Sequence, residues 1–234
     1  MQRRHFHHLG LGAIGSLMLA TWQQAHALSL ADLSGADASS GVKAALAKGA
    51  ESAVALLGQS DGFLGNPKVR IPLPGYLEDA AKVMKSMGQG KRIDELITSI
   101  NRAAEAAVPL GKDILVQAVQ SMSVTDAKNI LTGGDTSVTE FFVTKTRAPL
   151  SERFLPVVNK ATENVGLTQK YNAFAGKAAS FGLLKPEESN LAGYVTGKTL
   201  DGLFFMIGEE ERKIRQNPAG AGSAVLQRVF GALR

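Results

Sequence analysis

Apolar side chains recur at helical spacing along most of the chain. Their recurrence at i, i+3, i+4 and i+7 is typical of helices that bury one face. We therefore expect helices over residues 39–57, 76–87, 125–131, 191–217 and 223–233, a long helix over 93–122 that Pro109 kinks or divides, and helical stripes from 137 onward and over 150–165 with a bend at Pro156.

One segment, residues 61–75, lacks this periodicity and is predicted to be an extended strap. Its prolines and glycines prevent a helix. Val69, Ile71 and Leu73 alternate with arginine and proline, which is typical of an extended chain with one buried side. We expect that side to lie on the helices.

The turn Gly133-Gly134-Asp135-Thr136 combines the end of one predicted helix with the start of the next. Glycine suits the C-terminal cap, and Asp or Thr suits the N-terminal cap. Ser137 and Glu140 then have the spacing of a capping box, in which each side chain bonds the other residue's backbone N–H.

The composition supports a packed helical domain. Hydrophobic residues make up 44% of the chain and charged residues 20%, which leaves enough apolar surface for a core and argues against disorder. There is no internal repeat and no second run of strands. We predict an all-α fold: a single-domain irregular helical bundle with one extended Pro/Gly-rich strap.

Residues 1–27 are typical of an export signal peptide. Arg3 and Arg4 form a positive start, a short apolar run follows, and Ala25-His26-Ala27 has the A-x-A form of a cleavage site. The apolar run is too short to span a bilayer. We expect residues 28–234 to be the helical domain of the mature protein, and its location to be periplasmic.

The export route is either Sec or twin-arginine. Arg3-Arg4 followed by His5 and Phe6 resembles the twin-arginine signal, but Gln2 stands where that signal usually has Ser or Thr. Ordinary Sec signals also begin with arginines, so both routes stay open.

Removal of the leader takes away every histidine and the single tryptophan. His5, His7, His8, His26 and Trp22 all precede the cleavage site, and the chain has no cysteine. The mature chain therefore lacks the residues for a Ser-His-Asp or Cys-His nucleophile, a zinc site of the usual nitrogen and sulfur ligands, or a haem histidine. We expect no metal and no cofactor, and disulfides are excluded.

The charge of the chain narrows the choice of partners. The net charge is +5, and it falls to +3 once Arg3 and Arg4 are removed. This excess is too small to indicate nucleic acid. We expect no transmembrane segment in the mature chain, and as partners an apolar small molecule or lipid, or an envelope protein.

Five segments of the mature chain resemble a known bacterial family. They are GFLGNPKVRIPLP (62–74), INRAAEAAVP (100–109), LTGGDTSVTEFF (131–142), YVTGKTLDGLFFMIGEEERKIRQNP (194–218) and the closing VLQRVFGALR. In spacing and order they are similar to domain of unknown function 4197, and the resemblance covers essentially the whole mature chain. It implies an exported, mostly helical protein, and it assigns no activity to any residue.

Three local motifs have a structural interpretation that we prefer to a functional one. Gly197-Lys198-Thr199 looks like the end of a phosphate-binding loop, but Ala192 stands where that loop needs glycine, and the motif falls inside a predicted helix. The charged run over 209–215 is interpreted as a solvated helix end with Glu209–Lys213 and Glu211–Arg215 pairs. The turn at Asp135-Thr136 is interpreted as two caps rather than an anion site.

Two function classes remain. The preferred one is a non-enzymatic envelope protein that binds an apolar ligand or a partner between its helices, where Gly193, Gly197, Gly202 and Gly208 permit close approach or leave a groove. The alternative is an all-α hydrolase of cell-wall glycan with a carboxylate acid, which requires a Glu in an apolar cleft. Glu140 is the best candidate for that role, but it is equally suited to a cap, so we assign no catalytic residue.

A binding surface is predicted where three polar segments could converge: the strap, the turn before residue 137, and the polar face of the helix after residue 191. Arg70 and Arg147 are suited to bind a carboxylate, either an internal one such as Asp201 or Glu210, or one on a ligand. We favour internal ion pairs that fasten the strap. The predicted binding residues are Asn66, Lys68, Arg70, Asp135, Thr136, Arg147, Lys198, Asp201 and Glu210.

Overall fold

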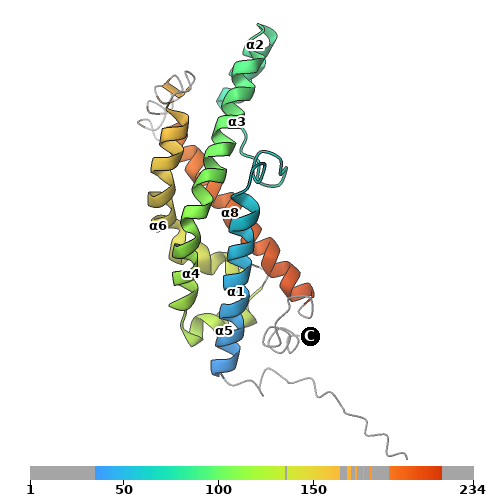
Figure 1. Cartoon of the computed structure of the whole chain (residues 1–234), viewed down its shortest axis with the longest axis vertical. Coiled ribbons are helices and arrows are strands. Elements are labelled where there is room, and N and C mark those ends of the chain that lie inside the picture. The colour runs from blue at the N-terminus through green and yellow to red at the C-terminus, as the bar shows by residue number, and fades with distance from the viewer. Residues whose placement is uncertain are drawn as a thin grey trace, which may run out of the picture.

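The protein is helical throughout the regions that its computed structural model describes: residues 35–134, 136–163 and 190–217, with positions 168, 169, 172, 176 and 180 between them. These regions contain no strand. The elements are α1 (Gly35–Leu57), α2 (Gly75–Ser86), α3 (Gly90–Ala107), the 3-10 turn η2 (Val108–Gly111), α4 (Lys112–Gln120), α5 (Val124–Thr132), α6 (Ser137–Thr162) and α8 (Leu191–Gln216) (Figure 1). The leader, Asp135 and the predicted helix over 223–233 lie outside the described residues.

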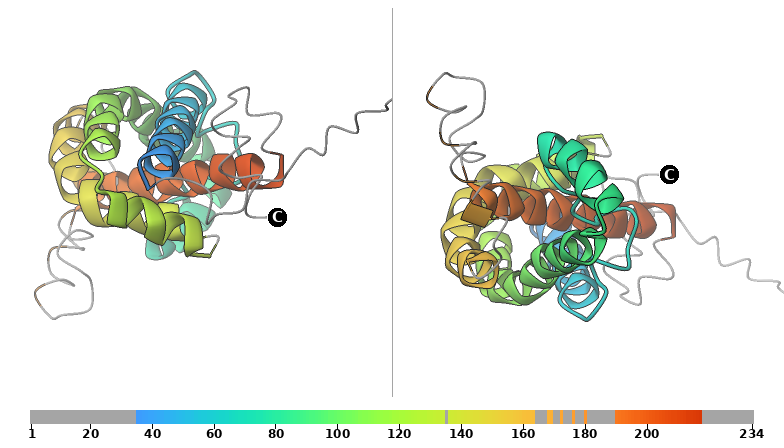
Figure 2. Two further views of the ribbon diagram at one scale, coloured as in Figure 1. Left: turned by 90° about the horizontal axis from the view of Figure 1, so that it is seen from below. Right: turned by 90° about the horizontal axis from the view of Figure 1, so that it is seen from above.

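Helix α8 lies across the other long helices. Figure 2, viewed along the long axis, shows α1, α3 and α6 close to end-on and α8 lying across them. Helix α8 packs most extensively on α6, then on α1, and also touches α3. At one end of the molecule, α2 and the beginning of α3 project beyond the other helices (Figure 1).

The buried side chains follow the helical stripes that the sequence predicts. Leu46 of α1, Ile100 of α3 and Leu203 of α8 each expose 3% or less of their surface. Burial of one such side chain stabilises a fold by roughly 1.5–3 kcal/mol. The apolar face of each helix therefore determines which side of that helix is turned toward the core.

Pro109 divides the long predicted helix, as expected. The 3-10 turn Val108–Gly111 separates α3 from α4. Gly111 in this turn lies directly against α6, because a Cβ atom there would lie 2.6 Å from Leu150 and 2.9 Å from Phe154. The division and the missing side chain together let α6 approach the turn closely.

Helix α6 is one continuous helix of 26 residues, although it contains Pro149 and Pro156. Its buried stripe passes both prolines at intervals of four residues and consists of Phe142, Thr146, Leu150, Phe154 and Val158, none more than 1% exposed. Packing of this stripe holds the helix together where the prolines remove backbone hydrogen bonds.

The predicted capping box at Ser137 and Glu140 is wrong. Ser137 is already the first residue of α6, and its hydroxyl donates to the carbonyl oxygens of Ile130 and Gly134. A capping box forms instead at the start of α5, where Ser123 and Asp126 each accept the other's backbone N–H at 3.0 Å. The hydrogen bonds from Ser123 lower the pKa of the Asp126 carboxyl.

The strap, residues 61–75, connects α1 to α2 and lies on the bundle as predicted. Its first part is a series of turns, in which the Asn66 carbonyl accepts the N–H groups of Val69 and Arg70. Its last part is extended, and Val69, Ile71 and Leu73 are buried on the helices. The strap therefore adds apolar side chains to the core without being helical.

The buried side chain of Asn101 on α3 fixes the extended part of the strap. Its Oδ1 accepts the N–H of Ile71 at 2.8 Å, and its Nδ2 donates to the carbonyl oxygens of Ile71 and Ile97 at 2.9 and 2.8 Å. One amide thus replaces the partners that a β-strand would have given Ile71.

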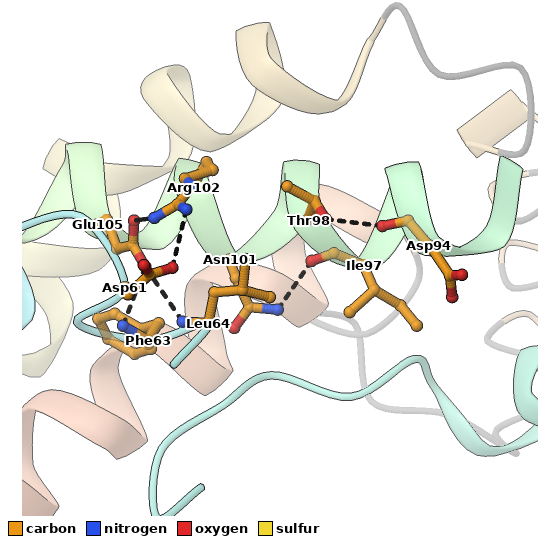
Figure 3. A network of polar contacts seen from close by, with 9 residues as sticks. All are labelled: Asp61, Phe63, Leu64, Asp94, Ile97, Thr98, Asn101, Arg102 and Glu105. Atoms are coloured by element: carbon orange, nitrogen blue, oxygen red, sulfur yellow. Dashed lines mark hydrogen bonds and ion pairs between the residues drawn. The ribbon is translucent and has the colours of Figure 1, made fainter. Parts of the chain in front are cut away.

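One turn further along α3, Glu105 fixes the turns of the strap (Figure 3). Its Oε1 accepts the N–H groups of Phe63 and Leu64 at 3.0 and 3.1 Å, and its Oε2 accepts Arg102 Nη1 at 2.6 Å. Arg102 also reaches Asp61 Oδ1 at 2.8 Å, and its hydrogen bonds, first to Glu105, raise its pKa. The buried carboxylate is therefore both neutralised and hydrogen-bonded.

We predict that Asn101→Leu lowers the free energy of unfolding by about 3 kcal/mol, because the N–H and C=O of Ile71 would stay buried without partners. Urea denaturation of the variant measures this loss. The control is Glu95→Gln on the exposed side of α3, where a distant ion pair contributes little. A variant within 1 kcal/mol of the wild type would show that Asn101 does not hold the strap.

Candidate functional site

The strap residues among the predicted binding residues lie apart from the others. Asn66 Oδ1 accepts the N–H of Lys68 at 3.1 Å, which stabilises a local turn. Lys68 Nζ pairs with Glu209 Oε2 of α8 at 2.7 Å and lies 5.9 Å from the centre of the Phe205 ring. Lys68 therefore joins the strap to α8.

Arg70 does not fasten the strap. Its side chain is exposed and forms no ion pair with any residue in the described ranges. The role expected of Arg70 belongs to Asn101 and Glu105, which sequence reasoning missed. The available signal was a pair of polar residues four positions apart on the apolar side of a predicted helix.

Thr136 and Glu210 also lie away from each other. Thr136 is exposed at the start of α6, and its hydroxyl donates to Glu140 Oε1 at 2.9 Å. Glu210 faces α1, where it accepts from Ser52 at 3.3 Å and pairs with Lys213 at 2.6 Å. Asp135 lies outside the described residues.

The structure brings together Arg147, Lys198 and Asp201 at one groove between α6 and α8. Its volume is about 690 Å³, which lies within the range of small-molecule sites. The described residues that line it are Val143, Thr144, Arg147, Ala148, Ser151, Leu155, Asn190, Gly193, Tyr194, Thr196, Gly197, Lys198, Leu200 and Asp201.

Arg147 is held by α8 from two sides. Its Nη2 donates to Asp201 Oδ1 at 2.8 Å, and its guanidinium lies 6.0 Å from the centre of the Phe204 ring. Asp201 was one of the two internal partners expected for this arginine. No other described side chain accepts from the guanidinium, so several of its five N–H donors stay available.

Lys198 is the second cation at the groove. Its ammonium lies 5.9 Å from the centre of the Tyr194 ring, and it forms no ion pair with a carboxylate in the described part of the chain. The Tyr194 hydroxyl donates to the Pro72 carbonyl at 3.3 Å. The end of the strap therefore helps to position the aromatic ring beneath Lys198.

Thr196 is one of the groove residues, and its buried hydroxyl has no hydrogen-bond partner in the described part of the chain. The residue is 2% exposed. Thr199, one turn later, instead donates to the Val195 carbonyl at 2.8 Å. A buried hydroxyl without a hydrogen-bond partner lowers the stability of the fold. Such unpaired groups are often found at functional sites.

The glycines of α8 do both things that the sequence suggested. A Cβ at Gly202 would lie 2.8 Å from Phe63, and one at Gly208 would lie 2.9 Å from Thr139, so these two positions allow close packing. A Cβ at Gly197 would meet nothing within 4 Å, and Gly193 and Gly197 both line the groove. The missing side chains leave this space open.

The phosphate-loop motif is helical, as predicted. Gly197-Lys198-Thr199 lies within α8, and Thr199 is completely buried. A phosphate-binding loop needs free backbone N–H groups, and a helix interior has none.

The charged run at the end of α8 differs from the prediction in two ways. Glu209 pairs with Arg212 and Lys68, not with Lys213. Glu211 and Arg215 do pair, at 2.7 Å, but their side chains are only 6% and 17% exposed. Arg215 also donates to the Ile130 carbonyl at 2.8 Å, so this side of the helix end is buried, while Arg212 and Lys213 on the other side stay exposed.

Glu140 lines a cleft of mixed character, with Ile130 and Phe141 beside Thr136 and Lys145. It is exposed on α6, whereas its neighbours Phe141 and Phe142 are buried. The buried carboxylate of Glu105 accepts two backbone N–H groups and pairs with Arg102, so its oxygens are used to hold the strap.

The described residues hold neither a metal-binding cluster nor a membrane-spanning helix. No three His, Cys, Asp or Glu side chains there are grouped so that they could hold a metal ion. No helix in the same part of the chain is long and apolar enough to cross a membrane.

We predict that Thr196→Val raises the thermal midpoint of the ligand-free protein, because it replaces an unpartnered buried hydroxyl with a methyl group of the same size. Thr199→Val is the matched control, and we expect it to lower stability by about 1 kcal/mol through its lost hydrogen bond. Calorimetry distinguishes the two. An equal loss in both variants would mean that the Thr196 hydroxyl is already bonded.

Comparison with known proteins identifies the family. No curated protein and no solved structure matches the chain. Residues 32–231 match a family described as Protein of unknown function (DUF4197). Because the match covers most of the sequence, the chain belongs to the DUF4197 family.

Proposed function

We propose that this chain is an exported, non-enzymatic protein of the cell envelope that binds a small molecule in the groove between α6 and α8. The observation that carries the proposal is the open space of about 690 Å³ beside Gly197, between two helices that pack closely elsewhere. Glycine in a helix interior destabilises the helix by roughly 0.5–1 kcal/mol relative to alanine. A binding role explains why glycine is present at position 197, because its missing side chain leaves space for a ligand.

The polar groups around the groove support a binding role. Arg147 and Lys198 offer donors that no described protein group takes up fully, and they come from two helices that pack on the core. Small-molecule sites typically combine an apolar lining with a few such groups. Catalysis receives no comparable support, because Glu140, the carboxylate considered for an acid role, is exposed on α6.

The envelope location rests on the leader sequence. The arginines at positions 3 and 4, the short apolar run and the Ala25-His26-Ala27 motif together match an export signal. The chain has no cysteine, so no disulfide stabilises it in an oxidising compartment. Its extensive helical core supplies the stability instead.

To test the groove, Gly197→Leu fills it with a side chain that meets no existing atom at Cβ. We expect the variant to lose any small molecule that native mass spectrometry detects on wild-type protein from the envelope fraction. Its thermal midpoint should be unchanged or raised, since leucine favours a helix more than glycine does.

Gly75→Leu is the matched control, because a Cβ there also meets nothing within 4 Å and the residue lies at the start of α2, outside the groove. This control should keep the bound mass. Retention of the same mass by the Gly197 variant would contradict the proposed site.

The second test concerns export. We expect envelope protein to begin at Leu28, and N-terminal sequencing checks this. Replacement of Arg3 and Arg4 by lysine should block export by the twin-arginine route and leave Sec export unaffected. Soluble cytoplasmic protein that keeps residue 1 as its major form would overturn the proposal.

A further inference from the structure

The charged side chains along the groove are distributed unequally. Among the described lining residues, Arg147 and Lys198 are positive and Asp201 is negative, which leaves an excess of one positive charge. Asp201 uses one nitrogen of Arg147 and holds it in place. The excess charge and the remaining guanidinium donors therefore face the groove without an internal carboxylate to satisfy them.

The charges lie toward one end of the groove. Helix α6 ends and α8 begins at the same end of the molecule (Figure 1), so the two helices run in opposite directions. The Arg147–Asp201 pair fixes their register. Eight residues beyond Arg147, or about 12 Å at the rise of an α-helix, Leu155 lines the far end.

The far end of the groove carries no charged side chain among its described lining residues. Leu155 is 41% exposed and offers apolar surface at this end. Ser151, Asn190 and Gly193 also line this end, whereas Tyr194, whose ring lies 5.9 Å from the Lys198 ammonium, lines the groove next to the charged end. An elongated ligand would therefore meet cations near Arg147 and uncharged, partly apolar surface near Leu155.

We infer that the ligand of this groove is an amphiphile with one negative charge, whose acidic group lies at Arg147 and Lys198 and whose hydrocarbon chain extends toward Leu155. The inference rests on the proposed function of the groove. A single carboxylate or phosphodiester balances the excess charge, and a guanidinium with free N–H groups suits either acid. Burial of the chain removes the exposed leucine surface from water.

The experiment measures binding of three twelve-carbon probes by titration calorimetry below their micelle concentrations. These three probes are the anionic dodecanoate, the neutral monododecanoyl glycerol and the cationic dodecyltrimethylammonium. Two further probes, dodecylphosphocholine and dodecyl methyl phosphate, distinguish a zwitterionic lipid headgroup from a simple anion. We expect dodecanoate or dodecyl methyl phosphate to bind at least ten-fold more tightly than the neutral and cationic probes.

Three variants locate the charge. Arg147→Met and Lys198→Met should each weaken binding of the anionic probe by about ten-fold or more, as expected for one lost hydrogen bond to a charged group. Arg70→Met is the control, because Arg70 is an exposed arginine that lies outside the groove. All three should fold, since the Arg147–Asp201 pair is half exposed and contributes little to stability.

The outcomes separate this inference from the proposed function. Equal affinity for neutral and anionic probes, or no effect of the Arg147 and Lys198 substitutions, overturns the anionic class even if Gly197→Leu still removes a native mass. Binding of dodecanoate that persists in the Gly197→Leu variant places the probe outside the groove and overturns the inference as well. The inference is supported if Arg147→Met, Lys198→Met and Gly197→Leu all lose selectivity for the anionic probes and Arg70→Met keeps it.

Discussion

The fold depends on hydrogen bonds from two side chains of α3 to the backbone of a segment that is not helical. Asn101 and Glu105 bind the N–H groups of Ile71, Phe63 and Leu64, so the strap can lie on the bundle with its polar backbone satisfied. Without these bonds, burial of the strap would leave several donors unpaired, each at a cost of about 1–3 kcal/mol. Phe63 and Ile71 are core residues only because this cost is avoided.

The strap in turn restrains α8. Phe63 lies against Gly202, Lys68 pairs with Glu209, and the Pro72 carbonyl accepts the Tyr194 hydroxyl. These contacts are spread along most of the helix. They hold α8 in one position across α1, α3 and α6, and this position determines where α6 and α8 touch and where they separate.

The groove results from an unequal use of small residues along α8. At Gly208 the glycine brings α6 close, whereas at Gly197 the same residue type faces empty space. Position 208 lies eleven residues after position 197, which corresponds to roughly 16 Å of helix. One helix pair therefore combines a tight contact with an opening, and the tight contact keeps the opening from collapsing. The Arg147–Asp201 pair lies between the tight contact at Gly208 and the groove at Gly197.

Much of the fold follows from the sequence alone, because helical periodicity, proline and glycine act locally. The stripes in α1, α3 and α8, the division at Pro109 and the irregular strap are all consequences of nearest-neighbour geometry. Local rules were insufficient for α6, where the packing of Phe142, Leu150 and Phe154 carries the helix through two prolines. They also misplaced a capping box, because Ser123 and Ser137 have the same kind of spacing and only the backbone conformation before each decides which one caps.

Side-chain partners were decided by the tertiary structure. The sequence identified Arg147, Lys198 and Asp201 as residues of interest, but it placed them together with Arg70 and Glu210, which the bundle directs elsewhere. It also treated Glu211 and Arg215 as solvent-exposed, whereas the fold leaves only 6% and 17% of their side chains exposed and gives Arg215 the Ile130 carbonyl as a partner. Residue type and spacing determined which elements form and which chemistries are absent. The groove, its charge and its open glycine depend on how two helices far apart in sequence cross, which no local pattern specifies.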